Sequence, residues 1–340
     1  MIDTYKTYPF WRTDIDYVNA ALDAAKIGRV HTLCTSAGGR EIRYITYGEK
    51  EDYGRTANYS SACGARDPKY YADREGKRPT ILLIGSTHGG EKEGVAALMN
   101  LISLMETGKD LLGESVPAIT EEYASLQPRL VIVPIYNIDG HVRCVPDSML
   151  GDSHATVRHY DQGNWTDGTF CEWPDVKKIH PIRDVSYLGA YFNDDGINLM
   201  HDNFFAPMAE ETKAMFRLAD EEAPECVIGL HGGSNITNCL LQPDYVPVYT
   251  KEAVHRLALD IAERQTARGL LSRVEAVKGE AGYPPPSFNL TSALHHVCGA
   301  VSSTYESNMG MSIPNACTAE EILLHHYCLF ESLMTLAWRD

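Results

Sequence analysis

Short apolar segments that alternate with helical patterns constrain this chain more than any other feature. Three such runs lie at Thr80–Gly85, Leu130–Ile135 and Cys226–Leu230, and a further strand is expected at Ala300–Thr304. Strands that are apolar on both faces occur inside parallel sheets covered by helices. The pattern therefore predicts an α/β fold, a three-layer α/β/α sandwich around a mixed, mainly parallel central sheet.

The other expected elements come from turn signals and helical spacing. Val30–Thr35 and Ile42–Thr46 are expected to pair as a hairpin, because Ala37-Gly38-Gly39-Arg40 between them is typical of a tight turn. Apolar residues recur at helical intervals in four segments. These segments are Asp14–Lys26, Lys92–Glu106, Thr250–Arg268 and Ile322–Trp338.

The chain is expected to form one domain over residues 1–340, because no linker and no internal repeat divides it. Two stretches interrupt the pattern. Residues 49–78 are polar, rich in tyrosine and punctuated by glycine and proline, which predicts an irregular insertion. Residues 144–195 form a second, longer irregular insertion that carries aromatic residues, and loops of that length are usually functional.

Charge and cysteine usage exclude several classes of partner. With 30 Lys and Arg against 46 Asp and Glu, the net charge is −16. Such a chain repels nucleic acid and anionic lipid, so neither is an expected partner. The sequence contains no uninterrupted apolar run of about 18 residues, so no membrane-spanning segment is expected. The first residues lack a signal-peptide pattern, and the nine cysteines contain no CxxC pair, so a cytoplasmic location is expected.

Several common catalytic motifs are absent. The sequence contains no GxGxxG, GxxxxGK[ST], GxSxG or HExxH pattern. Their absence disfavours a dinucleotide oxidoreductase, a P-loop NTPase, a serine hydrolase and a thermolysin-like protease.

The segment His88-Gly89-Gly90-Glu91 lies where a buried strand ends and a helix begins. Ligands of open α/β sheets bind at this end of the strands, and the two glycines allow a tight turn that points both side chains at one centre. His231 ends a second buried strand. Two histidines and one glutamate are a known ligand set for catalytic zinc, so we expect one Zn²⁺ per chain at His88, Glu91 and His231.

Glu306 follows a further strand. A carboxylate at the end of a buried strand is costly unless it is paired or functional. Beside a metal-bound water it can act as a general base and then pass the proton to the leaving amine. The alternative is a glutamate that caps a helix or forms a salt bridge.

The order of these motifs resembles that of the carboxypeptidase A-like zinc metallocarboxypeptidases, and the chain is identified as a divergent member of that family. After HxxE come Asn137-Ile138-Asp139-Gly140, the segment Gly196–His201, the strand-end His231 and Thr304-Tyr305-Glu306. The resemblance implies the same three zinc ligands and Glu306 as general base.

Two further catalytic residues are implied by the resemblance alone. The family uses an arginine to stabilise the oxyanion, and Arg183 lies at a comparable interval; its alternative is a solvated loop residue. The family also places a tyrosine on a mobile loop before the catalytic glutamate. Tyr283 matches that position, although a tyrosine beside three prolines is also typical of a rigid loop.

The chain departs from the family at Met200-His201, where typical members have Asn-Arg. That pair binds the C-terminal carboxylate of the substrate, and arginine does so bidentately. We expect Met200 and His201 in the substrate pocket. Either another cation replaces the arginine, such as Arg143, Arg158 or a lysine of residues 144–195, or the substrate carries no such carboxylate.

Three functions follow as hypotheses. The first is a zinc-dependent hydrolase of carboxypeptidase type that acts on a peptide bond. The second is a zinc-dependent deacylase or amidase of small N-acyl amino acids or other amides. The third is a non-catalytic binding protein on a peptidase scaffold, which the retention of all three ligands and of Glu306 disfavours.

Overall fold

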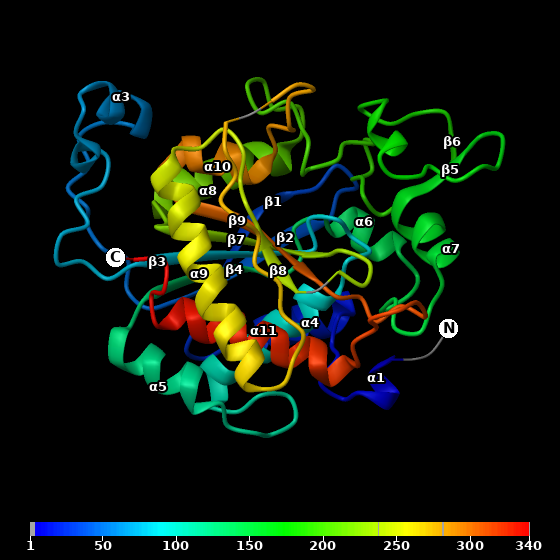
Figure 1. Ribbon diagram of the computed structural model, residues 1–340, viewed down its shortest axis with the longest axis horizontal. Helices are drawn as coiled ribbons and strands as arrows, with labels where there is room; N and C mark the ends of the chain where they lie inside the picture. Colours follow the sequence, from blue (N-terminus) through cyan, green and yellow to red (C-terminus); the bar gives the residue numbers. More distant parts are fainter. Residues whose placement is uncertain (1–3, 237, 281, 340) are drawn as a thin grey trace.

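The structure is a computed structural model that describes residues 4–236, 238–280 and 282–339. Its main sheet has the strand order β1-β2-β4-β3-β7-β9-β8 and lies at the centre of the molecule (Figure 1). The strands are β1 Arg29–Thr35, β2 Glu41–Tyr47, β3 Thr80–Gly85, β4 Arg129–Val133, β7 Cys226–Gly232, β8 Cys239–Leu241 and β9 Val301–Ser307.

The four central strands β4, β3, β7 and β9 run parallel to one another. β1 and β2 form an antiparallel hairpin that continues the sheet at β4, and β8 pairs antiparallel with β9 at the other edge. The expected mixed sheet with a parallel centre is therefore confirmed, and so is the expected hairpin.

Helices cover both faces of this sheet (Figure 1). α4, α5, α9 and α11 pack on one side, and α8 and α10 pack together on the other. The helices are α1 Thr4–Thr7, α2 Ile15–Ala24, α3 Tyr59–Gly64, α4 Glu93–Thr107, α5 Pro117–Leu126, α6 Ile138–Arg143, α7 His154–Val157, α8 Glu210–Glu222, α9 Val248–Ala267, α10 Leu290–Cys298 and α11 Ala319–Met334. The result is the three-layer α/β/α sandwich.

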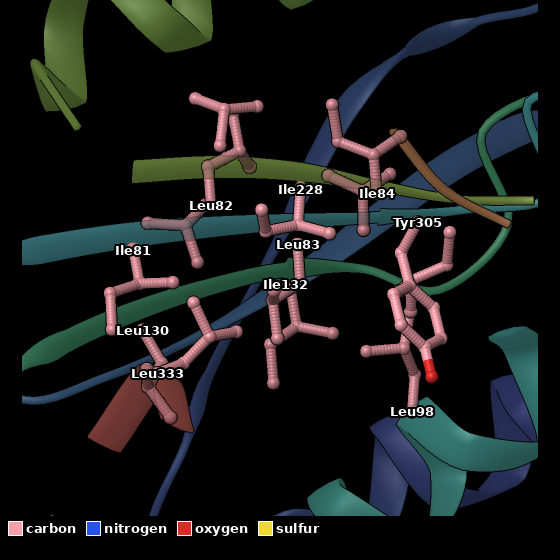
Figure 2. Close-up of a cluster of buried hydrophobic side chains, with 14 of the residues drawn as sticks. Ile81, Leu82, Leu83, Ile84, Leu98, Leu130, Ile132, Ile228, Tyr305 and Leu333 are labelled. Atoms are coloured by element: carbon pink, nitrogen blue, oxygen red, sulfur yellow. The ribbon is translucent and has the colours of Figure 1, made fainter. Parts of the chain in front are cut away.

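The core is built around β3, all six residues of which are buried. Alternate side chains of a strand point to opposite faces. Figure 2 shows Ile81 and Leu83 on the face that α4 and α11 cover, where Leu98 and Leu333 meet them. Leu82 and Ile84 point to the opposite face, so this strand is fixed from both sides and its end is a rigid platform.

The two stretches expected to be irregular contain short elements. Residues 49–78 include α3, whose first turn is capped by Asn58 through a 2.9 Å bond from the Ser61 backbone N–H. Residues 144–195 include α7 and a two-stranded sheet of β5 (Gly163–Trp165) and β6 (Val185–Leu188). Such short elements leave no periodic pattern, which is why the sequence did not predict them.

Among the described residues, no helix combines the length and apolar character that crossing a membrane requires. All nine cysteines are free thiols, and seven of them are buried.

Candidate metal centre and active site

The carboxyl ends of β3, β7 and β9 lie side by side at one edge of the parallel sheet. In the register of these strands, Gly85 pairs with Leu230, and His231 pairs directly with Glu306. Chemical groups that the sequence separates by more than 200 residues are brought together in this way. The site is therefore a consequence of parallel strand order, as expected for open α/β sheets.

The loop from β3 to α4 carries His88 and Glu91 and is held by close backbone packing. The Gly89 N–H donates a 2.8 Å bond to the Ala190 carbonyl. A Cβ at Gly89 would lie 2.1 Å from the carbonyl carbon of Gly140. Close approach, rather than a left-handed φ, therefore requires this glycine, which differs from the tight turn expected from the sequence.

The Asn137–Gly140 motif packs against this loop at Gly89 and is itself held by hydrogen bonds of Asp139. The Asp139 carboxylate accepts bonds from Ser36 Oγ at 2.6 Å and from the Gly38 N–H at 2.8 Å. The Arg40 guanidinium adds a 2.9 Å ion pair to the same carboxylate. The hairpin turn at one end of the sheet is thus tied to the segment against which Gly89 packs.

His88, Glu91 and His231 meet in a buried cluster. His88 Nδ1 lies 2.8 Å from Glu91 Oε1, and His231 Nδ1 lies 2.8 Å from Glu91 Oε2. The two imidazole rings are nearly perpendicular, with centroids 4.9 Å apart. Potential ligand atoms of the three residues all lie within 4.8 Å of one another, a set suited to a metal ion.

The charge states of the cluster also suit a cation. Burial on its own raises the pKa of Glu91, but the two histidines outweigh it and bring the pKa to about 2. Burial lowers the pKa of His88. Glu91 is therefore an anion and His88 is neutral at pH 7, the states in which carboxylate and imidazole bind metal. Glu91 raises the pKa of His231 against the effect of burial.

Glu306 stands beside this cluster and is partly exposed. Burial raises its pKa to about 7, although His231 pulls in the opposite direction. A Cβ on Gly233 would lie 2.6 Å from Glu306 Oε2, so glycine at this position leaves room for the carboxylate. A carboxyl group that titrates near neutral pH is suited to proton transfer.

One cavity of about 730 Å³ contains all four side chains. Strand ends form its base. Residues between 154 and 177 of the long insertion form part of the wall, and residues from 232–236, 241–244 and 287–291 form another part. The volume lies in the range of small-molecule sites, so a substrate of a few residues fits.

A family model described as zinc carboxypeptidase matches residues 17–285. The chain belongs to the zinc carboxypeptidase family. The match includes the HxxE segment and His231 and ends before Glu306, which the structure places beside them.

Solved structures of the family share the fold of this zinc carboxypeptidase family member. The metallo-carboxypeptidase of Burkholderia cenocepacia superposes with a TM-score of 0.59 at 14% identity, over 95% of this chain and 68% of that one. Carboxypeptidase A of Helicoverpa armigera gives 0.55 at 14% identity, over 96% and 73%. Bovine thrombin-activatable fibrinolysis inhibitor gives 0.53 at 11% identity, over 96% and 99%. By sequence alone, no curated protein matches the chain.

Met200 and His201, which were expected in the substrate pocket, both line the cavity. Ser287 Oγ lies 3.0 Å from His201 Nδ1. Burial, followed by the charge of Lys177, lowers the pKa of His201 to about 2, so this ring is neutral near pH 7. It cannot supply the charge of the arginine that typical family members have at this position.

Three other expected residues are not among those that line the cavity. Arg143 is bound by the carbonyls of Leu188 and Phe192 and by a 2.7 Å ion pair to Asp194, so its guanidinium supports the insertion. Arg183 is exposed, and Tyr283 is 97% exposed. In this arrangement none of the three reaches the His88–Glu91–His231 cluster.

Two residues that the sequence did not single out lie in the cavity. Tyr191 stacks on the His88 ring, with centroids 4.0 Å apart and planes 20° apart. Lys177 lies on the insertion wall, in the short turn Asp175–Lys177. Lys177 is one of the two lysines of residues 144–195 that were expected as candidate replacements for the missing arginine, whereas the only signal for Tyr191 was the length and aromatic content of the insertion.

Proposed function

We propose that the chain is a zinc-dependent hydrolase of a peptide bond or a related amide bond. The observation that carries the proposal is the juxtaposition of His88, Glu91 and His231 with Glu306 in one cavity. A metal ligand set alone is also compatible with storage or structure. Glu306 pairs in strand register with His231 and adds a carboxyl group beside the ligand set, which is the group that proton transfer requires.

His88, Glu91 and His231 would hold one Zn²⁺ per chain. When bound there, zinc polarises a carbonyl and lowers the pKa of water toward neutrality. The chain supplies the rest. Tyr191 fixes the plane of the His88 ring by stacking on it, and the other proposed ligands and Glu306 line the same cavity.

Glu306 is proposed as the proton carrier. Its carboxylate takes a proton from the attacking water and gives it to the leaving nitrogen. Both transfers require a group that is readily protonated and deprotonated, and a pKa of about 7 satisfies this at neutral pH.

Within this class, carboxypeptidase action is our first assignment and deacylation of small N-acyl amino acids is the second. The fold and family support the first. Met200 and the neutral His201 line the cavity and supply no cation for a carboxylate, which leaves room within the second assignment for amides that lack a C-terminal carboxylate. A purely binding role is disfavoured because no ligand of the cluster is missing.

One assay separates these assignments. A pool of short peptides, with free and with amidated C-termini, and a panel of N-acyl amino acids are incubated with zinc-loaded protein and analysed by mass spectrometry. Loss of the last residue from free C-termini only supports carboxypeptidase action. Turnover of the N-acyl panel alone supports deacylation. No chelator-sensitive product in either set contradicts the proposed hydrolase.

Glu306→Gln is the matched variant, because it keeps shape while removing the base. A product that forms equally fast with this variant comes from a contaminant or from another site.

The partners we propose are a peptide or small amide, and neither nucleic acid nor membrane. The nine free thiols favour a reducing compartment such as the cytoplasm.

A further inference from the structure

Lys177 differs from the other cations of the cavity wall in having no carboxylate partner. Arg158 pairs with Glu172 at 3.1 Å, and the Lys278 ammonium lies 3.6 Å from Asp244. Over the described part of the chain, no carboxylate oxygen lies within 4.0 Å of Lys177 Nζ. Its charge is therefore available to a ligand, whereas the other two are already neutralised.

Lys177 lines the same cavity as Glu91 and Glu306. Its charge acts on both Glu91 and Glu306, and after burial it is the largest influence that lowers the pKa of His201. Trp173 positions the lysine, since Nζ lies 5.6 Å from the centre of the Trp173 ring. The neighbouring Lys178 has a different environment: it pairs with Asp175 at 2.8 Å and is not among the residues that line the cavity.

Among the described residues that line the cavity, the only other lysine or arginine side chains are the paired Arg158 and Lys278. Met200 and the neutral His201 carry no charge, and Arg143 is bound to Asp194 and two carbonyls. A negatively charged substrate group that enters here would meet one free cation, on the wall built by the insertion.

We propose that Lys177 is the specificity residue of this cavity and binds a carboxylate on the substrate next to the amide that is cleaved. That the bound molecule is a substrate rests on the proposed hydrolase function. The recognition of its carboxylate is a binding property that can be tested separately. It selects free acids over the corresponding amides. It also assigns the task to a residue of the insertion rather than to the segment that contains Met200 and His201.

The test measures binding rather than turnover. Glycine, phenylalanine, glutamate and lysine, each N-acetylated and prepared as the free acid and as the amide, are titrated by calorimetry into the Glu306→Gln variant. The titration is run with zinc and in chelator, because a carboxylate can also bind the metal directly. For at least one pair we expect the acid to bind about tenfold more tightly than the amide under both conditions.

Three variants in that background locate the preference. Lys177→Met is expected to abolish it, Lys177→Arg to retain it, and Lys178→Met to leave it unchanged. Equal binding of acids and amides, no binding of either, or a preference that survives in Lys177→Met each overturns the inference. A preference for acids without any hydrolysis by the wild-type protein supports Lys177 and contradicts only the proposed hydrolase.

Discussion

His231 and Glu306 are direct partners across the parallel strands β7 and β9. Side chains at paired positions of neighbouring strands project to the same face of a sheet and lie close together. A proposed metal ligand and a proposed proton carrier therefore share one rigid backbone frame. Their separation is fixed by the hydrogen bonds of the sheet rather than by a loop, which suits groups that must act in one reaction.

The first prediction concerns Glu306. Glu306→Gln preserves the size of the side chain but removes its ability to accept a proton, so kcat is expected to fall by about 10²–10⁴-fold. The three ligands are untouched, so zinc content by elemental analysis should equal that of the wild type. Activity within a factor of two of wild type would assign proton transfer to another group.

The second prediction concerns His231. His231→Ala removes one of three proposed ligands, and loss of an outer-shell partner alone typically costs about 10–100-fold in affinity, so zinc binding should weaken by more than that. Competition with a chromogenic chelator measures it. His154→Ala, an exposed histidine on the cavity wall, is the matched control. Equal zinc affinity in the two variants would show that His231 is not the third zinc ligand.

The sequence predicted the sheet and the proposed metal cluster because both depend on buried strands. Residues 81–84 are apolar without interruption, so burial of this strand on both faces followed from composition alone. His88, Glu91 and His231 could be placed together because each lies directly after such a strand. No long-range information was needed beyond the rule that parallel strands end at the same edge.

The substrate side of the cavity could not be predicted in the same way. Arg143 is held by Leu188, Phe192 and Asp194, whose positions depend on how residues 144–195 fold back along the sheet edge. Residues 144–195 show no hydrophobic periodicity from which their fold could be predicted. For the same reason the sequence named a lysine of this stretch only as one of several candidate cations and did not single out Tyr191. The catalytic roles given to Arg183 and Tyr283 by family resemblance stay predictions that the geometry does not support.

The third prediction concerns Gly89. In Gly89→Ala the added methyl would lie 2.1 Å from the Gly140 carbonyl carbon and 2.2 Å from the His141 nitrogen. Backbone atoms cannot move aside cheaply, so the free energy of unfolding should fall by about 2–3 kcal/mol and zinc affinity should fall with it. Gly64→Ala, which meets no atom within 4 Å, is the control for urea denaturation. Equal stability of the two variants would contradict the packing described for the HxxE loop.

The last prediction concerns pH and a buried histidine that is not among the residues lining the cavity. His326 in α11 is fully buried, its Nδ1 lies 2.8 Å from the Ile322 carbonyl, and burial lowers its pKa to about 4. In the unfolded chain the imidazole titrates near 6.5. Between these values the unfolded state binds a proton that the folded state does not, so stability is complete above pH 6.5 and falls as the pH drops toward 4. From pH 7.5 to pH 5 this residue should lower the free energy of unfolding by about 2 kcal/mol.

Urea titrations at both pH values should show a smaller pH dependence of stability for His326→Gln than for the wild type. The exposed control His154→Gln should show the same pH dependence as the wild type. If His326→Gln loses as much stability between the two pH values as the wild type does, the acid sensitivity arises from other groups.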